Sequence, residues 1–271
     1  MRKETFQWLI PALLAVGVAA ALWFFWGQGG QEPIETEEPA APAADTPEER
    51  EQQPEGPPEH PLETPADAAA KPGLRPLPPL EESDDYFKLE LSGLFGEALD
   101  NQLADSGVIE RIVATVDNLP RQKIAERIKP MAGASGRFKV QNGDGEGKFV
   151  IDPDNYQRYD TLVGMVANAD PAELEELYRR FYPLFQKAYV DLGYPQGYFN
   201  DRVIEVIDHL LETPTIEEPV ELVRPHVLYE YADPALEELS PGQKVLLRIG
   251  NEHAATIKEK LREFRRRIIV P

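Results

Sequence analysis

One short segment of the chain, Gly193 to Pro214 (GYPQGYFNDRVIEVIDHLLETP), gathers side chains suited to chemistry or to binding. Asp and His can act as general acids or bases, so one hypothesis is a hydrolase that uses Asp201, Asp208 or His209. No nucleophile elbow, phosphate-binding glycine loop or dinucleotide motif accompanies them, and a chain without cysteine cannot be a thiol enzyme. We therefore predict no catalytic residue and no cofactor. The candidate binding residues are Tyr198, Asn200, Asp201, Arg202, Asp208 and His209.

The same residues also have a structural explanation at the start of a helix. If Asn200 is the amino-terminal cap, Phe199 and Ile204 stand at the two positions of a hydrophobic staple. Asp201 would then lie at the positive end of the helix dipole, where a carboxylate is favoured. Residues three or four apart on one flank can pair with each other, and these are Arg202, Glu205 and His209.

Two stretches could be considered for a metal: Glu205 to His209, which offers carboxylates and an imidazole one turn apart but needs a further ligand from elsewhere, and the turn Asn142 to Gly147 (NGDGEG), which resembles the opening of a calcium loop. An EF-hand requires an acidic ligand at the twelfth position, where this chain has Pro153. Asn-Gly and Asp-Gly are also typical of tight hairpin turns, so we prefer a hairpin and keep a calcium-stabilised module as an alternative. The four histidines form no pair at zinc-ligand spacing, and we predict no metal site.

The carboxy-terminal part of the chain is predicted to be mainly helical. A capping oxygen precedes a proline at Asp152-Pro153, Asp170-Pro171, Asp233-Pro234 and Ser240-Pro241, and proline fits the first helical position. Apolar residues at helical spacing are expected to form the core. They are Val108, Ile112, Val113 and Val116; Tyr159, Leu162, Val163 and Val166; Leu174, Leu177, Phe181 and Leu184; Val203, Ile207 and Leu210; Ile257, Leu261, Phe264 and Ile268. We expect Pro183 to kink or divide the third of these helices.

Two stretches have the composition of β-strands. Phe138 to Val140 and Lys148 to Ile151 flank the glycine-rich turn, and Val220 to Tyr231 contains a β-rich run around His226 to Tyr229. A small hairpin or three-stranded sheet beside the helices would account for both. The predicted fold class is mainly α, with one globular helical domain over residues 84–271 and this small β element.

Ahead of the domain, Phe6 to Trp26 (FQWLIPALLAVGVAAALWFFW) is almost entirely apolar. About 20 helical residues cover the roughly 30 Å of bilayer hydrocarbon, so we predict a transmembrane helix there. A cleaved signal peptide with a cut near Gly27 to Gly29 is the alternative, although aromatic residues at both ends of the run favour a retained anchor. Because Arg2 and Lys3 precede the run, residues 1–5 are expected in the cytoplasm and the rest outside it.

Residues 27–83 are predicted to be a disordered tether. They contain 13 of the 26 prolines and 14 acidic against 3 basic residues, too little apolar surface to offset the entropy of ordering. The net charge of −20 at pH 7 argues against nucleic acid as a partner. One basic run, Lys258 to Arg267 (KEKLREFRRR), is expected to be the solvated end of the last helix, with contact to anionic lipid or a polyanion as the alternative.

Three stretches resemble a known family: VATVDNLPR (Val113 to Arg121), YRRFYPLFQKAYVDLGYPQGYFNDRVIEVIDHLL (Tyr178 to Leu211) and LSPGQKVLLRIGNEHA (Leu239 to Ala254). They are similar to the bacterial domain-of-unknown-function family numbered 3014. Its members resemble this chain in layout, with an amino-terminal anchor, a proline-rich spacer and one carboxy-terminal domain. The resemblance implies a place in the cell envelope and carries no activity, cofactor or catalytic residue.

We therefore predict a single-pass protein of the bacterial inner membrane with a periplasmic carboxy-terminal domain. Its expected function is non-enzymatic: it binds or scaffolds another envelope component, with an envelope protein as the partner and the membrane engaged through the amino-terminal helix. The alternatives are the envelope hydrolase and the calcium-stabilised module described above.

Overall fold

The computed structural model describes residues 57–62, 75–96, 99, 103–121, 130, 138–145, 147–226 and 228–269. The predicted transmembrane helix, Phe6 to Trp26, lies outside these residues, as does most of the predicted tether. Among the helices that are described, none combines the length and the apolar character needed to cross a bilayer.

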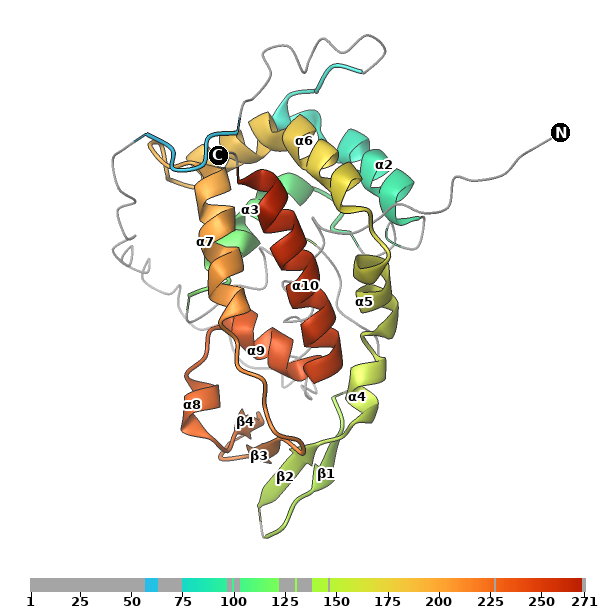
Figure 1. Cartoon of the computed structure of the whole chain (residues 1–271), viewed down its shortest axis with the longest axis vertical. Coiled ribbons are helices and arrows are strands. Elements are labelled where there is room, and N and C mark those ends of the chain that lie inside the picture. The colour runs from blue at the N-terminus through green and yellow to red at the C-terminus, as the bar shows by residue number, and fades with distance from the viewer. Residues whose placement is uncertain are drawn as a thin grey trace, which may run out of the picture.

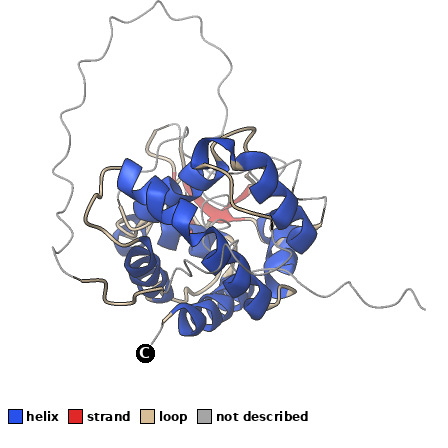
Figure 2. Ribbon diagram, turned by 90° about the horizontal axis from the view of Figure 1, so that it is seen from above, coloured by secondary structure: helices blue, strands red, loops and turns tan. Residues whose placement is uncertain are grey.

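The described part of the chain is a bundle of helices with a small sheet at one end (Figure 1). Helix α10 contacts α5, α6, α7 and α9, and α3 packs on α6 and α7. From above, the helices lie in front of the strands (Figure 2), which confirms the predicted mainly helical fold with a small β element. The helices are the 3-10 turn η3 (Leu80–Glu82), α2 (Asp84–Phe95), α3 (Val108–Asn118), α4 (Asp154–Gln157), α5 (Asp160–Ala167), α6 (Pro171–Asp191), α7 (Phe199–Leu211), α8 (Pro234–Glu237), α9 (Pro241–Arg248) and α10 (Asn251–Ile268).

Capping side chains start three of these helices, as predicted: Asp170 accepts from the Ala172 N–H, Asp233 from Ala235 and Ser240 from Gln243. The last pair is a complete capping box, because the Gln243 side chain also accepts from the Ser240 N–H. Helix α4 differs, because Pro153 is at its cap position and not at its first helical position; Asp152 accepts from the Asp154 N–H just ahead of the helix. Helix α6 continues unbroken through Pro183, so the predicted division does not occur. Burial of Tyr182 and Leu184 on either side holds the helix together there.

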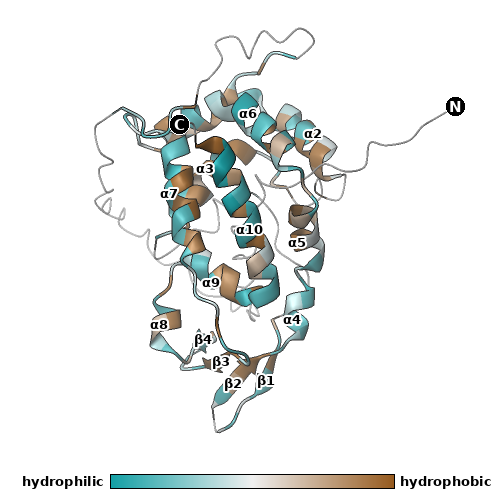
Figure 3. Ribbon diagram, in the orientation of Figure 1, coloured by the Kyte–Doolittle hydropathy of each residue, from teal (hydrophilic) through white to brown (hydrophobic). Residues whose placement is uncertain are grey.

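The predicted apolar stripes form the core, and every residue in them is buried. Aromatic rings from four helices meet at its centre, where the ring centroids of Phe87 and Phe181 are 4.9 Å apart and those of Tyr178 and Phe264 are 5.4 Å apart. Hydrophilic and hydrophobic residues alternate along α10 (Figure 3). The main core joins α2, α3, α5, α6, α7, α9 and α10, and a second apolar cluster includes residues of the sheet and Leu247 of α9.

The sheet is antiparallel and has four strands, in the order β1 (Val140–Asn142), β2 (Lys148–Ile151), β3 (Glu221–Val223) and β4 (Glu230–Tyr231). Val140 pairs with Ile151, and Leu222 pairs with both Phe149 and Tyr231. The predicted β1–β2 hairpin is confirmed. The predicted third strand is instead two short strands, and His226, Leu228 and Tyr229, where we expected the strand itself, belong to neither of them. Pro225 explains the difference, because it has no N–H to give to a ladder.

Two stretches that we assigned to the tether pack against the helical domain. Leu62 is 8% exposed and Leu80 is 4% exposed, and both belong to the main core. The buried Ser83 donates its hydroxyl to the Leu80 carbonyl at 2.7 Å, which closes η3 ahead of α2. The prediction of disorder therefore does not hold for residues 57–62 and 75–83. Their average composition is that of a tether, but single leucines supply apolar anchors that the average conceals.

Candidate functional site

The six predicted site residues lie on α7 or directly before it, and the helix starts differently from the prediction. Asn200 is not the cap: α7 begins at Phe199, and Tyr198 at the cap position makes no side-chain cap bond. Helix α6 supplies the acceptors instead. The Phe199 N–H donates to Gln186 Oε1 at 2.8 Å, and the Asn200 N–H donates to the Tyr182 hydroxyl at 3.4 Å. A neighbouring helix thus does the work that we assigned to a local side chain.

The Asn200 side chain is completely buried and bonded at both ends of its amide. Its Oδ1 accepts from the Tyr178 hydroxyl at 3.2 Å. Its Nδ2 donates to the Ile268 carbonyl at 3.2 Å and to the His60 carbonyl at 2.9 Å. Tyr178 and Ile268 fix the orientation of the amide, so its second donor points at the main chain of a distant segment.

That segment is Pro57 to Leu62, the blue trace beside the upper end of α7 in Figure 1. Asp201 accepts two successive main-chain N–H groups from it, Glu59 at Oδ2 (3.0 Å) and His60 at Oδ1 (2.8 Å). Leu62 then inserts its side chain into the core. Hydrogen bonds to a carboxylate are stronger than those between neutral groups, so Asp201 is the main polar contact of this segment.

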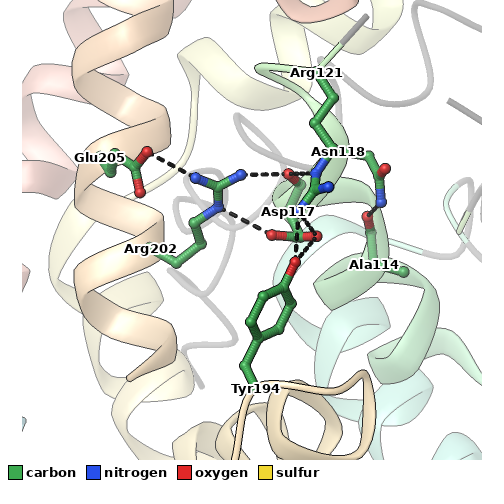
Figure 4. A network of polar contacts seen from close by, with 7 residues as sticks. All are labelled: Ala114, Asp117, Asn118, Arg121, Tyr194, Arg202 and Glu205. Carbon is green, nitrogen blue, oxygen red and sulfur yellow. Dashed lines mark hydrogen bonds and ion pairs between the residues drawn. The ribbon is translucent and has the colours of Figure 1, made fainter. Parts of the chain in front are cut away.

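Arg202 turns the other way, toward α3, and forms a buried polar network (Figure 4). Its Nε lies 3.1 Å from Asp117 Oδ1, and its Nη2 donates to the Asp117 carbonyl at 2.6 Å. Its Nη1 lies 2.7 Å from Glu205 Oε1. The Arg202 and Asp117 side chains are only 10% and 5% exposed, so this ion pair is shielded from water.

The second oxygen of Asp117 is bonded as well. Oδ2 accepts from the Tyr194 hydroxyl at 3.0 Å and pairs with Arg121 Nη2 at 3.1 Å. Burial, followed by the nearby charge of Asp117, raises the pKa of Tyr194. Burial lowers the pKa of Arg202, but its hydrogen bond to Glu205 and the charge of Asp117 outweigh that effect and raise it overall. The network therefore favours the charged form of Arg202 and links α3, α7 and the loop before α7.

The remaining two candidates attach the other end of α7 to its neighbours. Asp208 forms a two-point ion pair with Arg265 of α10, at 2.5 Å to Nε and 2.7 Å to Nη2. His209 Nε2 lies 2.8 Å from the hydroxyl of Ser240, which caps α9. Burial lowers the pKa of His209, which favours the neutral ring.

The structure places two of the proposed hydrolase residues, Asp201 and His209, far apart. Asp201 is in the first turn of α7 and His209 is in the last turn. Eight residues of helix separate them by about 12 Å along the axis. Tyr198 is 37% exposed at the surface near the start of α7. The geometry of the set is that of a helix attached to several neighbours, with a peptide segment bound at its amino end.

A surface pocket that the sequence did not indicate lies at the amino end of α10. It has a volume of about 410 Å³ and is lined by Tyr156, Glu218, Ile249, Gly250, Asn251, Glu252 and His253. Burial and the neighbouring Glu218 raise the pKa of Tyr156 to about 12. The two ring nitrogens of His253 lie 3.0 Å from the Ile249 carbonyl and 3.1 Å from Asp160 Oδ1. None of the six predicted site residues lines this pocket.

The possible calcium loop is the β1–β2 turn, as we preferred. Gly145 and Gly147 have φ of 127° and 77°, conformations that glycine adopts readily. Within the described ranges, no group of three or more His, Asp or Glu side chains is placed to hold a metal ion.

Two arginines of the basic run at the end of α10 pair with acids from other helices. Arg265 pairs with Asp208, and Arg267 Nη1 lies 3.2 Å from Glu175 of α6. Arg179 donates in turn to the Arg267 carbonyl at 3.0 Å, near the end of the helix. These two positive charges are thus used within the domain.

Comparison with known proteins identifies one family. A family model described as "Protein of unknown function (DUF3014)" matches residues 108–265, more than half of the chain. The match runs from the start of α3 to the last turn of α10 and so includes the Asp117 network and all of α7. No curated protein and no solved structure gave a significant match. The chain belongs to the DUF3014 family.

Proposed function

We propose that this chain is a non-enzymatic domain of the bacterial cell envelope that is tethered to the inner membrane and binds another envelope component. One observation carries the proposal: the amino end of α7 binds main-chain groups of residues 57–62 through Asn200 and Asp201. Recognition of main-chain groups is a common way for a domain to bind a peptide segment. The apolar run Phe6 to Trp26 and the proline-rich stretch after it support the tethering.

The engagement of the acidic and basic candidates supports binding over catalysis. Asp208 is held by Arg265, and His209 contacts the capping hydroxyl of Ser240. Both groups therefore have a structural role in joining α7 to a neighbouring helix.

Photo-crosslinking in cells tests the proposal. A photoreactive residue replaces Tyr198, which is 37% exposed near the start of α7, and a matched variant carries it in place of Leu89 of α2, which is 64% exposed. We expect a discrete protein adduct from position 198 and none of the same mass from position 89. Equal adducts at both positions, or turnover of a small substrate by the purified chain with no adduct, would contradict the proposal.

A fusion experiment tests the orientation separately. A reporter that is active only outside the cytoplasm is joined after Pro271. Activity of the reporter in intact cells is expected, because Arg2 and Lys3 precede the apolar run. Activity of a cytoplasm-specific reporter at the same position would overturn the proposed topology.

A further inference from the structure

We infer that the contact between α7 and residues 57–62 is an exchangeable peptide-binding site, and that residues 57–62 are its intramolecular occupant. The ligand class is a short bent segment of an envelope protein that presents two successive main-chain N–H groups to one carboxylate and, two residues later, a leucine. This inference rests on the proposed function and assigns it to one surface, built from Asn200, Asp201 and the part of the main core that buries Leu62.

The site binds main-chain atoms of the occupant and buries one of its side chains, that of Leu62. Asp201 binds the N–H groups of Glu59 and His60, and Asn200 binds the His60 carbonyl. Glu59 is exposed and His60 is half-buried, whereas Leu62 is buried at 8% exposure. A segment from another protein can make the same contacts if it carries the leucine, because the residues in the places of Glu59 and His60 are bound through their backbone atoms.

The binding groups are positioned by the domain itself. Asn200 is oriented by Tyr178 and by the Ile268 carbonyl, contacts that do not involve the occupant. Asp201 lies in the first turn of a 13-residue helix, where its carboxylate is favoured by the helix dipole. The site therefore does not need residues 57–62 for its assembly, and a preorganised site loses little entropy when it binds.

The occupant is held by contacts that are modest in number. Three hydrogen bonds and one buried leucine oppose the conformational entropy of ordering six residues, and these two contributions are of comparable size. Pro58 and Pro61 flank the bonded residues and limit the entropy that is lost. Covalent attachment raises the local concentration of the occupant, so a competing segment binds well only when the occupant is weakened.

Binding of a peptide in trans to the full chain tests the inference. The probe is a fluorescent peptide with the sequence of residues 57–62, followed by anisotropy. In the full chain, Leu62→Ser weakens the occupant and leaves the binding groups of α7 unchanged. We expect this variant to bind the probe at least tenfold more tightly than the wild-type chain. Adding Asp201→Asn should weaken that binding at least tenfold, as should a probe with Glu59→Pro, which lacks one of the two N–H groups.

A second variant keeps the test decisive if Leu62→Ser does not fold. Glu59→Pro in the full chain removes one N–H of the occupant and changes an exposed side chain, so the core is untouched. It should also tighten probe binding. If neither variant binds the probe more tightly than the wild type, residues 57–62 are a fixed part of the fold and the inference is overturned. If neither variant binds the probe more tightly but position 198 forms an adduct in cells, only the inference is refuted. If the variants bind the probe tightly but position 198 forms no adduct, only the proposed envelope function is refuted.

Discussion

Replacing Asp117 with alanine should destabilise the domain more than any exposed charge change. Its carboxylate accepts from Arg202, Arg121 and Tyr194, and the substitution removes all three contacts at once. The Arg202 guanidinium would then remain in a buried position with Glu205 as its remaining acidic partner in this network. Glu205 is a weak substitute, because its side chain is 59% exposed.

The expected magnitude follows from burial. Removing one partner of a buried ion pair costs about 3–5 kcal/mol, whereas an exposed pair is worth about 0–1 kcal/mol. Arg202 keeps its bond to the Asp117 main-chain carbonyl, so we expect a value near the lower end, about 3 kcal/mol. For a domain of this size that corresponds to a fall in melting temperature of roughly 6–12 °C.

Urea unfolding of the full chain, followed by far-ultraviolet circular dichroism, measures the loss. Asp154→Ala is the matched control: it removes the same side chain from an ion pair with Lys139 in which both members are 57% exposed. A double-mutant cycle with Arg202→Met isolates the pair, and we expect the double variant to lose less stability than the sum of the two single variants. If Asp117→Ala costs no more than Asp154→Ala, or if the cycle is additive, the network does not contribute as described.

Three other outcomes are expected. Gly242→Ala should lower the free energy of unfolding by about 1–3 kcal/mol although alanine has the better helix propensity, because the added Cβ would lie 2.7 Å from Leu210 Cδ2. Gly164→Ala is the control: its Cβ would have nothing within 4 Å, so thermal unfolding should show an unchanged or higher stability. Burial lowers the pKa of His209 in the native state, so the unfolded state binds more protons as the pH falls below the ordinary value of 6.5. The melting temperature should therefore fall more steeply below that pH in the wild type than in His209→Gln, and parallel curves would contradict the assignment. Added calcium should leave the melting temperature unchanged if Asn142 to Gly147 is only a hairpin turn, and a rise would support the calcium-stabilised module.

The local features of this fold could be predicted from the sequence because their causes lie within a few residues. The caps at Asp170, Asp233 and Ser240 each bind an N–H two or three residues away. The apolar stripes follow the period of one helix and predicted the buried faces correctly. The β1–β2 hairpin was indicated by its glycine-rich turn, and Pro225 could have shown that the later β-rich run would divide.

The contacts of the candidate site residues could not be predicted from the sequence. Arg202 pairs with Asp117, 85 residues away, and Asp201 binds N–H groups about 140 residues earlier in the chain. Such partners have no spacing rule, since they are set by how the helices pack.

What the sequence determined by itself was therefore the set of helices, their buried faces and their capped starts, because short-range hydrogen bonds and hydrophobic periodicity specify them. Only the tertiary structure decided that α7 would be capped by Gln186 of α6 and that Asn200 would be buried and face residues 57–62. The physical reason is that a polar side chain binds whichever complementary group the packed core places within reach. That choice depends on the whole arrangement of helices.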